Sequence, residues 1–160
     1  MGLFDKFKKN KKEEKQAAEV YVPAKGQVIA LEDVKDPVFS KKIMGDGFAV
    51  VPEDGKIISP IDGEVSFFAE TKHGLGLKGP NGLEVLVHIG LDTVELKGQG
   101  FEAKVEEGDK VKKGDLLCEV DLDFIKEKGY DPTVILVITN LGEYENMDID
   151  IETSPVIKVN

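Results

Sequence analysis

The sequence is poor in cysteine, histidine and tryptophan, and it has no long hydrophobic run. Of its 160 residues, one is cysteine, two are histidine and none is tryptophan. Cys118 therefore has no partner for an internal disulfide, and its apolar setting, DLLCEV, indicates a small core residue. No segment approaches the roughly 18 apolar residues of a membrane span, and no signal-peptide pattern is present. We therefore expect a soluble, cytoplasmic chain.

Acidic residues outnumber basic residues, except near the N-terminus. The formal net charge is −10, which argues against nucleic acid as a partner because phosphate backbones require clustered Lys and Arg. Residues 1–16 are the exception, with six Lys against three acidic residues. Leu3, Phe4 and Phe7 would share one face of a helix there, which suits weak contact with a membrane surface of anionic lipid. A solvated, disordered tail is the alternative reading.

The rest of the chain consists of short apolar runs separated by glycine and proline turns. Seventeen glycines and seven prolines set these runs at intervals of about eight to twelve residues, which is typical of an all-β sandwich or barrel. We expect a flexible tail, 1–19, and one β domain, 20–160. The predicted strands, antiparallel in such a fold, are Gly26–Leu31, Gly47–Val51, Lys56–Ser59, Gly63–Glu70, His73–Leu77, Leu83–Ile89, Gly100–Ala103, Leu116–Asp121, Thr133–Thr139 and Val156–Val159.

Two short helices are expected between these strands. The segment DPVFSKKIM predicts one, with Asp36 as its N-cap, Pro37 at its first position and Gly45 at its end. The segment DFIKEKG predicts the other, capped by Asp123 and stopped by Gly129. Both helices would be short turns on a β framework.

Two turn-and-strand units in the sequence are alike. PAKGQV at 23–28 and PIDGEV at 60–65 share the pattern Pro-x-x-Gly-x-Val, and EEGDKVKKGDLL adds a pair of Gly-Asp turns. Repeated units of this kind occur in sandwiches built from related halves, including lipoyl and biotinyl carrier domains. A swinging-arm carrier is therefore a rival function. Lys25 and Lys78 lie near turns, but neither has the Met or Ala neighbours of those carriers.

The two histidines lie in the two arms of one predicted hairpin. HGLGLKGPNGLEVLVH reads as strand, turn and strand, with GPNG as the reversal. If residues 80 and 81 are the two central residues of the turn, His73 lies directly opposite His88. If residues 81 and 82 are the central residues, His73 pairs with Gly90 and lies diagonal to His88. Both registers place the rings on one face, with Cβ atoms about 4.5 to 8 Å apart. A slip of one residue would place them on opposite faces.

Two neighbouring imidazoles limit the chemistry that such a site supports. Gly74, Gly76 and Gly90 would remove bulk around the rings and open the backbone to an incoming group. Mutual repulsion would keep at least one ring neutral near pH 7, with a lone pair free for nucleophilic attack. A hydrolytic zinc site would need a carboxylate as a third ligand. In a phosphoryl relay, one ring accepts the phosphoryl group and the other ring binds its oxygens. Because no nucleotide-binding loop is present, another protein would supply the phosphoryl group.

Four motifs, in order along the chain, resemble one bacterial family. GLEVLVHIGLDTVELKGQGF is similar to the active-site strand of the glucose-type IIA component of the sugar phosphotransferase system. EDVKDPVFSKKIMGDGFAVVP, FAETKHG and VEEGDKVKKGD match the same family, so the resemblance covers about Pro23 to Lys158. It implies an antiparallel β-sandwich or barrel and a transferase with a phosphohistidine intermediate. The phosphoryl group would pass from phospho-HPr to this chain, and then to the cysteine of a permease IIB domain during sugar uptake.

Carried over by position, the resemblance assigns a role to each residue of the site. His88 would be phosphorylated on Nε2, with its Nδ1–H bonded to the carbonyl of Gly90. His73 would bind the phosphoryl oxygens, and the Thr71 hydroxyl would orient its ring. No cofactor is obligatory, although in some members of the family the two histidines share a zinc ion with a partner's carboxylate.

The resemblance also implies a surface on which the protein partners dock. The matching residues are Asp36, Val38, Phe39, Ile43, Met44, Leu86, Asp92 and Val94. The two aspartates are expected to meet an arginine of HPr, and the others form an apolar surface left uncovered for transient complexes. In some members the unphosphorylated form regulates other proteins, so a regulatory binding protein is a second rival function.

Overall fold

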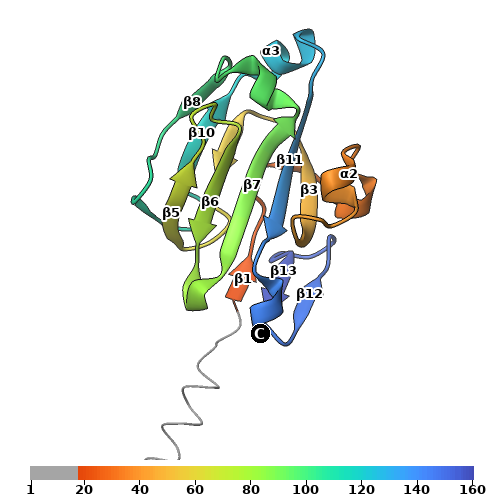
Figure 1. Cartoon of the computed structure of the whole chain (residues 1–160), viewed down its shortest axis with the longest axis vertical. Coiled ribbons are helices and arrows are strands. Elements are labelled where there is room, and N and C mark those ends of the chain that lie inside the picture. The colour runs from red at the N-terminus through yellow and green to blue at the C-terminus, as the bar shows by residue number, and fades with distance from the viewer. Residues whose placement is uncertain (1–17) are drawn as a thin grey trace, which may run out of the picture.

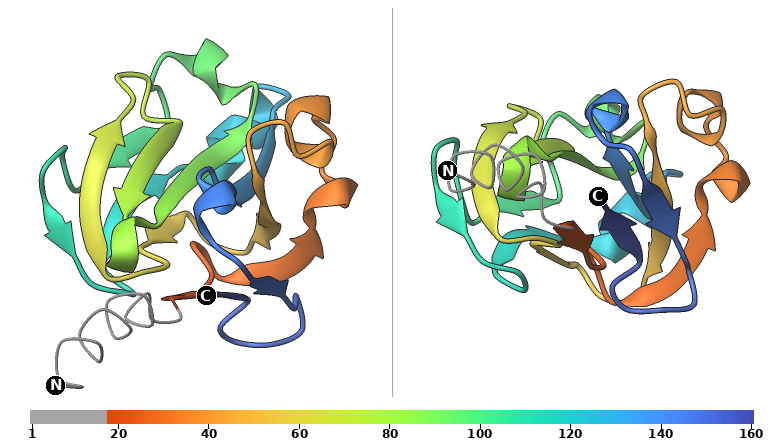
Figure 2. Two further views of the ribbon diagram at one scale, coloured as in Figure 1. Left: turned by 60° about the horizontal axis from the view of Figure 1, so that its bottom comes forward. Right: turned by 90° about the horizontal axis from the view of Figure 1, so that it is seen from below.

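The computed structural model describes residues 18–160, whose strands form three antiparallel sheets (Figures 1 and 2). The strands are β1 Ala18–Val20, β2 Gly26–Ala30, β3 Asp46–Pro52, β4 Lys56–Ile58, β5 Gly63–Phe68, β6 Gly74–Lys78, β7 Glu84–Leu91, β8 Phe101–Ala103, β9 Lys110–Val111, β10 Leu116–Val120, β11 Asp131–Ile138, β12 Met147–Ile149 and β13 Ile157–Val159. The helical elements are η1 Leu31–Asp33, α2 Pro37–Ser40, η2 Pro80–Gly82, η3 Thr93–Leu96, α3 Leu122–Glu127 and η4 Leu141–Glu143. The predicted all-β antiparallel fold with short helices is confirmed.

One large sheet and two small sheets enclose the core. The large sheet has the order β2-β3-β11-β7-β6-β5-β9, and the small sheets have the orders β4-β10-β8 and β1-β13-β12. Buried side chains from all three sheets form one continuous cluster, which includes Phe48, Ile57, Val87, Leu117 and Ile157. The large sheet therefore has one face on the core and one face turned outward.

A second, smaller apolar cluster covers part of the outward face of the large sheet. It consists of Leu31, Val34, Phe39, Ala49, Leu91, Ile135 and Val137. Its members come from η1 and α2 as well as from the sheet, and Figure 1 shows α2 beside β3. Because β11 lies beneath this second layer, it is buried on both faces and apolar at every position from 134 to 138. The cluster attaches α2 to the outer face of the sheet.

In the neighbouring strand β7, buried and half-buried side chains alternate, because no second layer covers all of its outer face. Val85, Val87 and Ile89 are at most 2% exposed and point into the core. Leu86 and His88 point the other way and are only half-buried. The alternation of a strand therefore places His88 on the outward face. His88 is not a residue of the main core.

Several predicted boundaries are corrected by the structure. The sequence reading missed β1, β9 and β12, each of only two or three residues. Ala18 pairs with Val159 in β13, so the domain begins before residue 20, where we had placed its start. The remainder of the predicted tail, including the proposed amphipathic helix, lies outside the described residues.

Both predicted helices are present, but the end of the first and the N-cap of the second were predicted wrongly. Asp36 caps α2, since its carboxylate accepts the backbone N–H of Val38 at 3.0 Å, but the helix ends at Ser40 and not at Gly45. The cap of α3 is Asp121 and not Asp123, because the Asp121 carboxylate is the one that accepts the backbone N–H three residues later. Among residues 18–160, no helix is long and apolar enough to cross a membrane.

The repeated turns lead into strands as predicted. Gly26 begins β2 and Gly63 begins β5, and a Cβ atom at either would lie 2.0 or 2.3 Å from a carbonyl oxygen of the adjacent strand. Only glycine permits this close approach. The two Gly-Asp turns are each closed by an Asp carboxylate that accepts a backbone N–H at 2.9 Å. These local signals were sufficient to predict where the strands begin.

Candidate functional site

The hairpin that carries the histidines has neither of the predicted registers. Gly79 N–H donates to the carbonyl of Leu83, which closes a loop of three residues. The strands consequently pair Gly74 with His88, whereas the two predicted registers paired His73 with His88 or with Gly90. The register predictions were wrong because both assumed a two-residue turn. In a regular strand this register would turn His73 away from His88.

The rings meet nevertheless, because His73 lies outside the regular part of β6. Lys72, the residue before it, has a left-handed backbone with φ of 61°. The carbonyl of His73 accepts the backbone N–H of Ile89 at 2.6 Å, which holds the end of the hairpin against β7. The ring centroids of His73 and His88 are 5.0 Å apart, with an interplanar angle of 80°. Loop geometry, and not strand alternation, therefore brings the two histidines together.

One nitrogen of each ring is held by a nearby hydrogen-bond partner. Nδ1 of His88 lies 2.8 Å from the carbonyl oxygen of Gly90. A carbonyl only accepts hydrogen bonds, so Nδ1 carries the proton and Nε2 of the neutral ring carries a lone pair. Nδ1 of His73 lies 2.5 Å from Oγ1 of Thr71. Both hydrogen bonds that the family resemblance implied are present in the structure.

The surroundings keep both rings neutral near neutral pH. Burial lowers the pKa of His73 below its ordinary value. Burial, followed by repulsion from His73, lowers the pKa of His88 as well. The hydrogen bond to Gly90 and the charges of Asp36 and Asp92 oppose this shift without reversing it. A neutral imidazole with a free Nε2 is the form that acts as a nucleophile.

The lowered pKa of His88 predicts a loss of stability in mild acid. Its ordinary value is near 6.5, so below about pH 6.5 the unfolded chain binds a proton more readily than the folded chain does. The contribution of the neutral His88 ring to the free energy of unfolding is fully present above about pH 6.5. It is lost as the pH falls towards the pKa that His88 has in the folded protein. In urea titrations at about pH 7.5 and about pH 5.5, the unmodified protein should lose more stability than His88→Gln. An equal loss in both proteins would contradict the prediction.

Four residues of the predicted docking surface have exposed apolar side chains. Val38 and Met44 are each 43% exposed, Ile43 is 68% exposed and Val94 is 43% exposed. Phe39 differs from the prediction because it is only 5% exposed. Its ring centroid lies 4.9 Å from that of His88, so it forms a wall of the site and offers little area to a partner.

The remaining docking candidates have mixed positions. Leu86 is half-buried beside His88 on β7 and packs against the outer cluster. Asp92 is exposed and has a left-handed backbone, with φ of 59°. Asp36 is partly buried, and one of its oxygens is occupied by the cap of α2. Both aspartates still exert an electrostatic effect on His88.

The three glycines near the histidines serve different purposes. Gly74 pairs with His88, and a Cβ there would meet only the carbonyl oxygen of Val87, at 3.9 Å. Gly90 has φ of 82° and supplies the carbonyl that binds His88. Gly76, in contrast, makes room for the ring of Phe67, so our prediction that it clears space for the histidines was wrong.

Other chemical groups are less suited to a reactive role. Cys118 is buried in the core, as predicted, and burial raises the pKa of its thiol to about 11. Such a thiol is not ionised at neutral pH and is a poor nucleophile. No group of three or more His, Cys, Asp or Glu side chains within residues 18–160 has the arrangement of a metal site. The histidine pair is therefore the candidate site.

Comparison with known proteins agrees with this choice. The family model for the phosphoenolpyruvate-dependent sugar phosphotransferase system, EIIA 1, matches residues 18–144. The chain belongs to this EIIA family. It is a glucose-type EIIA component of the sugar phosphotransferase system and so a transferase in sugar transport. Membership in this family does not support the rival reading as a lipoyl or biotinyl carrier.

Similar proteins cover most of this EIIA chain. The "PTS system glucose-specific EIIA component" of Halalkalibacterium halodurans is 46% identical over 139 residues, which are 87% of this chain and 80% of that protein. The "PTS system glucose-specific EIICBA component" of Streptococcus pneumoniae is 57% identical over 122 residues, 76% of this chain and 17% of that protein. The solved structure of glucose permease IIA from Mycoplasma capricolum superposes with a TM-score of 0.78 at 33% identity, covering 91% of this chain and 90% of that one.

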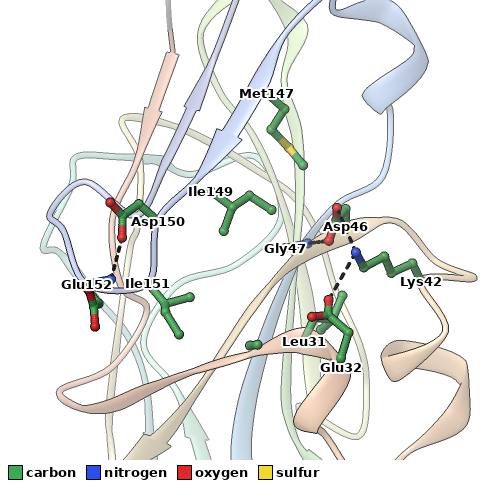
Figure 3. Close-up of a pocket in the computed structure, with 11 residues that line it drawn as sticks. Leu31, Glu32, Lys42, Asp46, Gly47, Met147, Ile149, Asp150, Ile151 and Glu152 are labelled. Atoms are coloured by element: carbon green, nitrogen blue, oxygen red, sulfur yellow. Dashed lines mark hydrogen bonds and ion pairs between the residues drawn. The ribbon is translucent and has the colours of Figure 1, made fainter.

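The EIIA domain also has a pocket of about 550 Å³ that contains neither histidine (Figure 3). Lys42 lies at its side, with Nζ 3.1 Å from Oε1 of Glu32 and 3.5 Å from Oδ2 of Asp46. Met147 and Ile149 of β12 line another side. Its lining includes none of the predicted site residues, so the pocket does not contribute to the site at His88.

Sequence reasoning missed one residue that shapes the EIIA site. Thr93 is fully buried, and its hydroxyl donates to the carbonyl of Ile89 at 2.5 Å. A Cβ atom at Gly90 would lie 2.4 Å from Cγ2 of Thr93, so Thr93 packs tightly against the segment that binds His88. The only sequence signal was a hydroxyl residue three positions after Gly90, in the segment that follows the apolar strand. The burial of Thr93 could not be predicted from that pattern alone.

Proposed function

We propose that this EIIA component accepts a phosphoryl group from phospho-HPr on Nε2 of His88 and passes it to the cysteine of a permease IIB domain. The observation that carries the proposal is the arrangement of the two rings. Nδ1 of each ring has a hydrogen-bond partner, and the ring centroids are 5.0 Å apart. The name of the Streptococcus relative, EIICBA, indicates that its EIIA part is fused to EIIB and EIIC parts, which supports a IIB domain as the acceptor.

In the first step the lone pair on Nε2 of His88 attacks the phosphorus atom in line with the donor's N–P bond. A new N–P bond forms at His88, and the electron pair of the broken bond returns to the donor's ring nitrogen. The attacking ring becomes more positive as its lone pair is shared. The carbonyl of Gly90 and the charges of Asp36 and Asp92 stabilise that charge. The site supplies alignment and electrostatic stabilisation, which are the main requirements of phosphoryl transfer.

His73 binds the oxygens of the phosphoryl group once it is on His88. In the neutral tautomer in which the Thr71 hydroxyl donates to Nδ1 of His73, Nε2 carries the N–H that donates to a phosphoryl oxygen. The negative phosphoryl group also favours protonation of His73; Nδ1–H then donates to Oγ1 of Thr71, and the bond from Nε2–H to the phosphoryl oxygen becomes stronger. In the second step a cysteine thiolate of the IIB domain attacks the phosphorus, a P–S bond forms, and the electron pair of the N–P bond returns to Nε2 of His88.

This relay needs no metal ion. His73 and His88 supply two imidazole ligands, and a zinc ion takes four. Because no third His, Cys, Asp or Glu side chain in the described part of the chain forms a cluster with them, a shared zinc ion would take its remaining ligands from a protein partner. The partners in this proposal also place the protein in the cytoplasm.

Incubation with phosphoenolpyruvate, enzyme I and HPr tests the proposal directly. We expect one acid-labile phosphate per chain, which peptide mapping should locate on His88. The matched control omits HPr and should leave the chain without phosphate. Failure to incorporate phosphate in the complete mixture, or its incorporation at another residue, would refute the proposed function.

We also propose that residues 1–16 keep the protein near membrane permeases. The support is sequence alone: six Lys against three acidic residues, with Leu3, Phe4 and Phe7 spaced for one helical face. Deletion of residues 1–16 should reduce cosedimentation with vesicles that contain anionic lipid, most clearly at low salt. Neutral vesicles are the control. Unchanged cosedimentation after the deletion would remove this idea.

A further inference from the structure

One aromatic side chain outside the predicted docking surface is exposed on the same face of the sheet. Phe67, on β5, is 44% exposed. Among the seven large apolar side chains that are exposed within residues 18–160, it is the aromatic one. Aromatic residues offer a large contact area with few rotatable bonds and are enriched in protein interfaces. An exposed phenylalanine is therefore a candidate contact for a protein partner.

A bulge in β5 turns Phe67 outward. Val65 pairs with Leu77 and is fully buried, whereas Phe67 pairs with Gly76, so β5 contains one extra residue at this point. In a regular strand, residues 65 and 67 would share one face, and Phe67 would point into the core with Val65. The extra residue places Phe67 on the opposite, outward face.

The ring of Phe67 lies over Gly76 and so on the face that carries His88. A Cβ atom built on Gly76 would be 2.5 Å from Cε1 of Phe67, which locates the ring above this glycine. Gly76 and Gly74 share one face of β6, because they are two residues apart. Gly74 pairs with His88, and Gly76 pairs with Leu86. The ring therefore spans the bare backbone of β6 on the side where His88 is exposed.

The ring is also close enough to contact any protein that reaches His88. Adjacent strands are about 4.8 Å apart, so the backbone of Phe67 lies about 10 Å from the backbone of Leu86. The ring of Phe67 extends over β6 and is therefore closer to Leu86. Leu86 and His88, two residues apart on β7, are separated by about 7 Å. A standard interface buries about 800 Å² per partner, which corresponds to a disc with a radius of about 16 Å. A disc of this size centred on His88 includes Phe67.

We propose that Phe67 is a docking residue for the phosphoryl donor, forming the β5 side of the apolar surface whose α2 side carries Val38 and Met44. This inference rests on the proposed function, because it takes as its occupant the protein that delivers a phosphoryl group to His88. The apolar surface then continues across the bare backbone of β6, with the histidine pair between its two sides. Asp36 and Asp92 add negative charge near His88 that suits a donor with a basic rim around its reactive residue.

Steady-state phosphate uptake from phospho-HPr tests the role of Phe67. Phe67→Ala should raise the KM for phospho-HPr about tenfold and leave kcat close to that of the unmodified protein, since the ring binds the donor and does not touch the reacting atoms. Phe67→Leu should recover most of the loss. Ile151→Ala is the matched control, because Ile151 is 38% exposed and lies after β12 in a different sheet; its KM should be unchanged.

Gly76→Ala provides a second test that leaves the phenyl ring in the protein. The added Cβ would occupy the position of the ring edge, so the flexible side chain of Phe67 must move away. We expect an increase in KM in the same direction as for Phe67→Ala. A KM for Phe67→Ala within twofold of the unmodified protein, or a fall in kcat without a change in KM, would overturn the inference. Failure of the proposed function is distinguishable, because the unmodified protein would then take up no phosphate at all.

Discussion

Replacing His88 with alanine is expected to reduce phosphate uptake from phospho-HPr to the background of a reaction without the protein. The loss should be on the order of a thousandfold or more, because no other group in the site replaces the attacking lone pair. Nδ1 of His88 lies 2.8 Å from the carbonyl oxygen of Gly90, which leaves Nε2 with the lone pair. Burial and repulsion from His73 lower the pKa of the His88 ring, so Nε2 is the available nucleophile. Radioactive phosphate transfer from phosphoenolpyruvate, followed over time, measures the effect.

The variant must be shown to be folded for this result to be informative. His88 is half-buried on an outward face, and its neighbours Val87 and Ile89 still pack into the core, so β7 should remain in place. Thermal unfolding and circular dichroism of His88→Ala should resemble those of the unmodified protein. Ile151→Ala, which truncates an exposed side chain outside the docking surface, should retain transfer. Normal uptake by a folded His88→Ala protein would show that another residue is phosphorylated.

Replacing His73 with glutamine is expected to slow transfer to the IIB domain about a hundredfold, and to slow uptake from phospho-HPr much less. Glutamine retains an amide N–H, but it cannot become a cation beside the phosphoryl group. During uptake we expect groups of the donor to share in binding the phosphoryl oxygens. In the proposed phosphorylated state, before the IIB domain binds, we expect that role to fall to His73, whose ring lies 5.0 Å from that of His88. Single-turnover measurements of the two steps separate these effects.

A variant at Thr71 provides a matched comparison for His73. Thr71→Val keeps the shape of the side chain and removes the hydroxyl that bonds Nδ1 of His73. It should slow the same step as His73→Gln, by a smaller factor, since His73 is still present but less well oriented. Equal slowing of uptake and release in His73→Gln would mean that the division of roles between the two histidines is wrong.

The nearness of the two histidines could be predicted, although the reasoning about register was incorrect. The hairpin and its approximate turn were visible in HGLGLKGPNGLEVLVH. The three-residue loop then placed Gly74, not His73, opposite His88. The left-handed backbone of Lys72 takes His73 out of the strand and returns its ring to His88. A positive φ at a lysine has no clear sequence signature, because it is imposed by the turn around it.

The outer layer of the site was harder to anticipate. Phe39 had the sequence pattern of a short helix and was expected on the docking surface, but it is buried against His88. Regular alternation would place Phe67 in the core with Val65, but a bulge between these two residues exposes it. Both outcomes depend on which elements cover the outward face of the large sheet. Local patterns of apolar residues do not contain that information.

The β architecture, most of the strands, the Asp36 cap and the two histidines as the candidate pair were all predictable from the sequence. Those features depend on local patterns: alternation, turn residues and a capping side chain that act within a few positions. The contact between the rings, the wall formed by Phe39 and the outward position of Phe67 were visible only in the folded protein. These features arise where segments distant in sequence pack together, so their geometry depends on register, loops and coverage of the sheet as a whole.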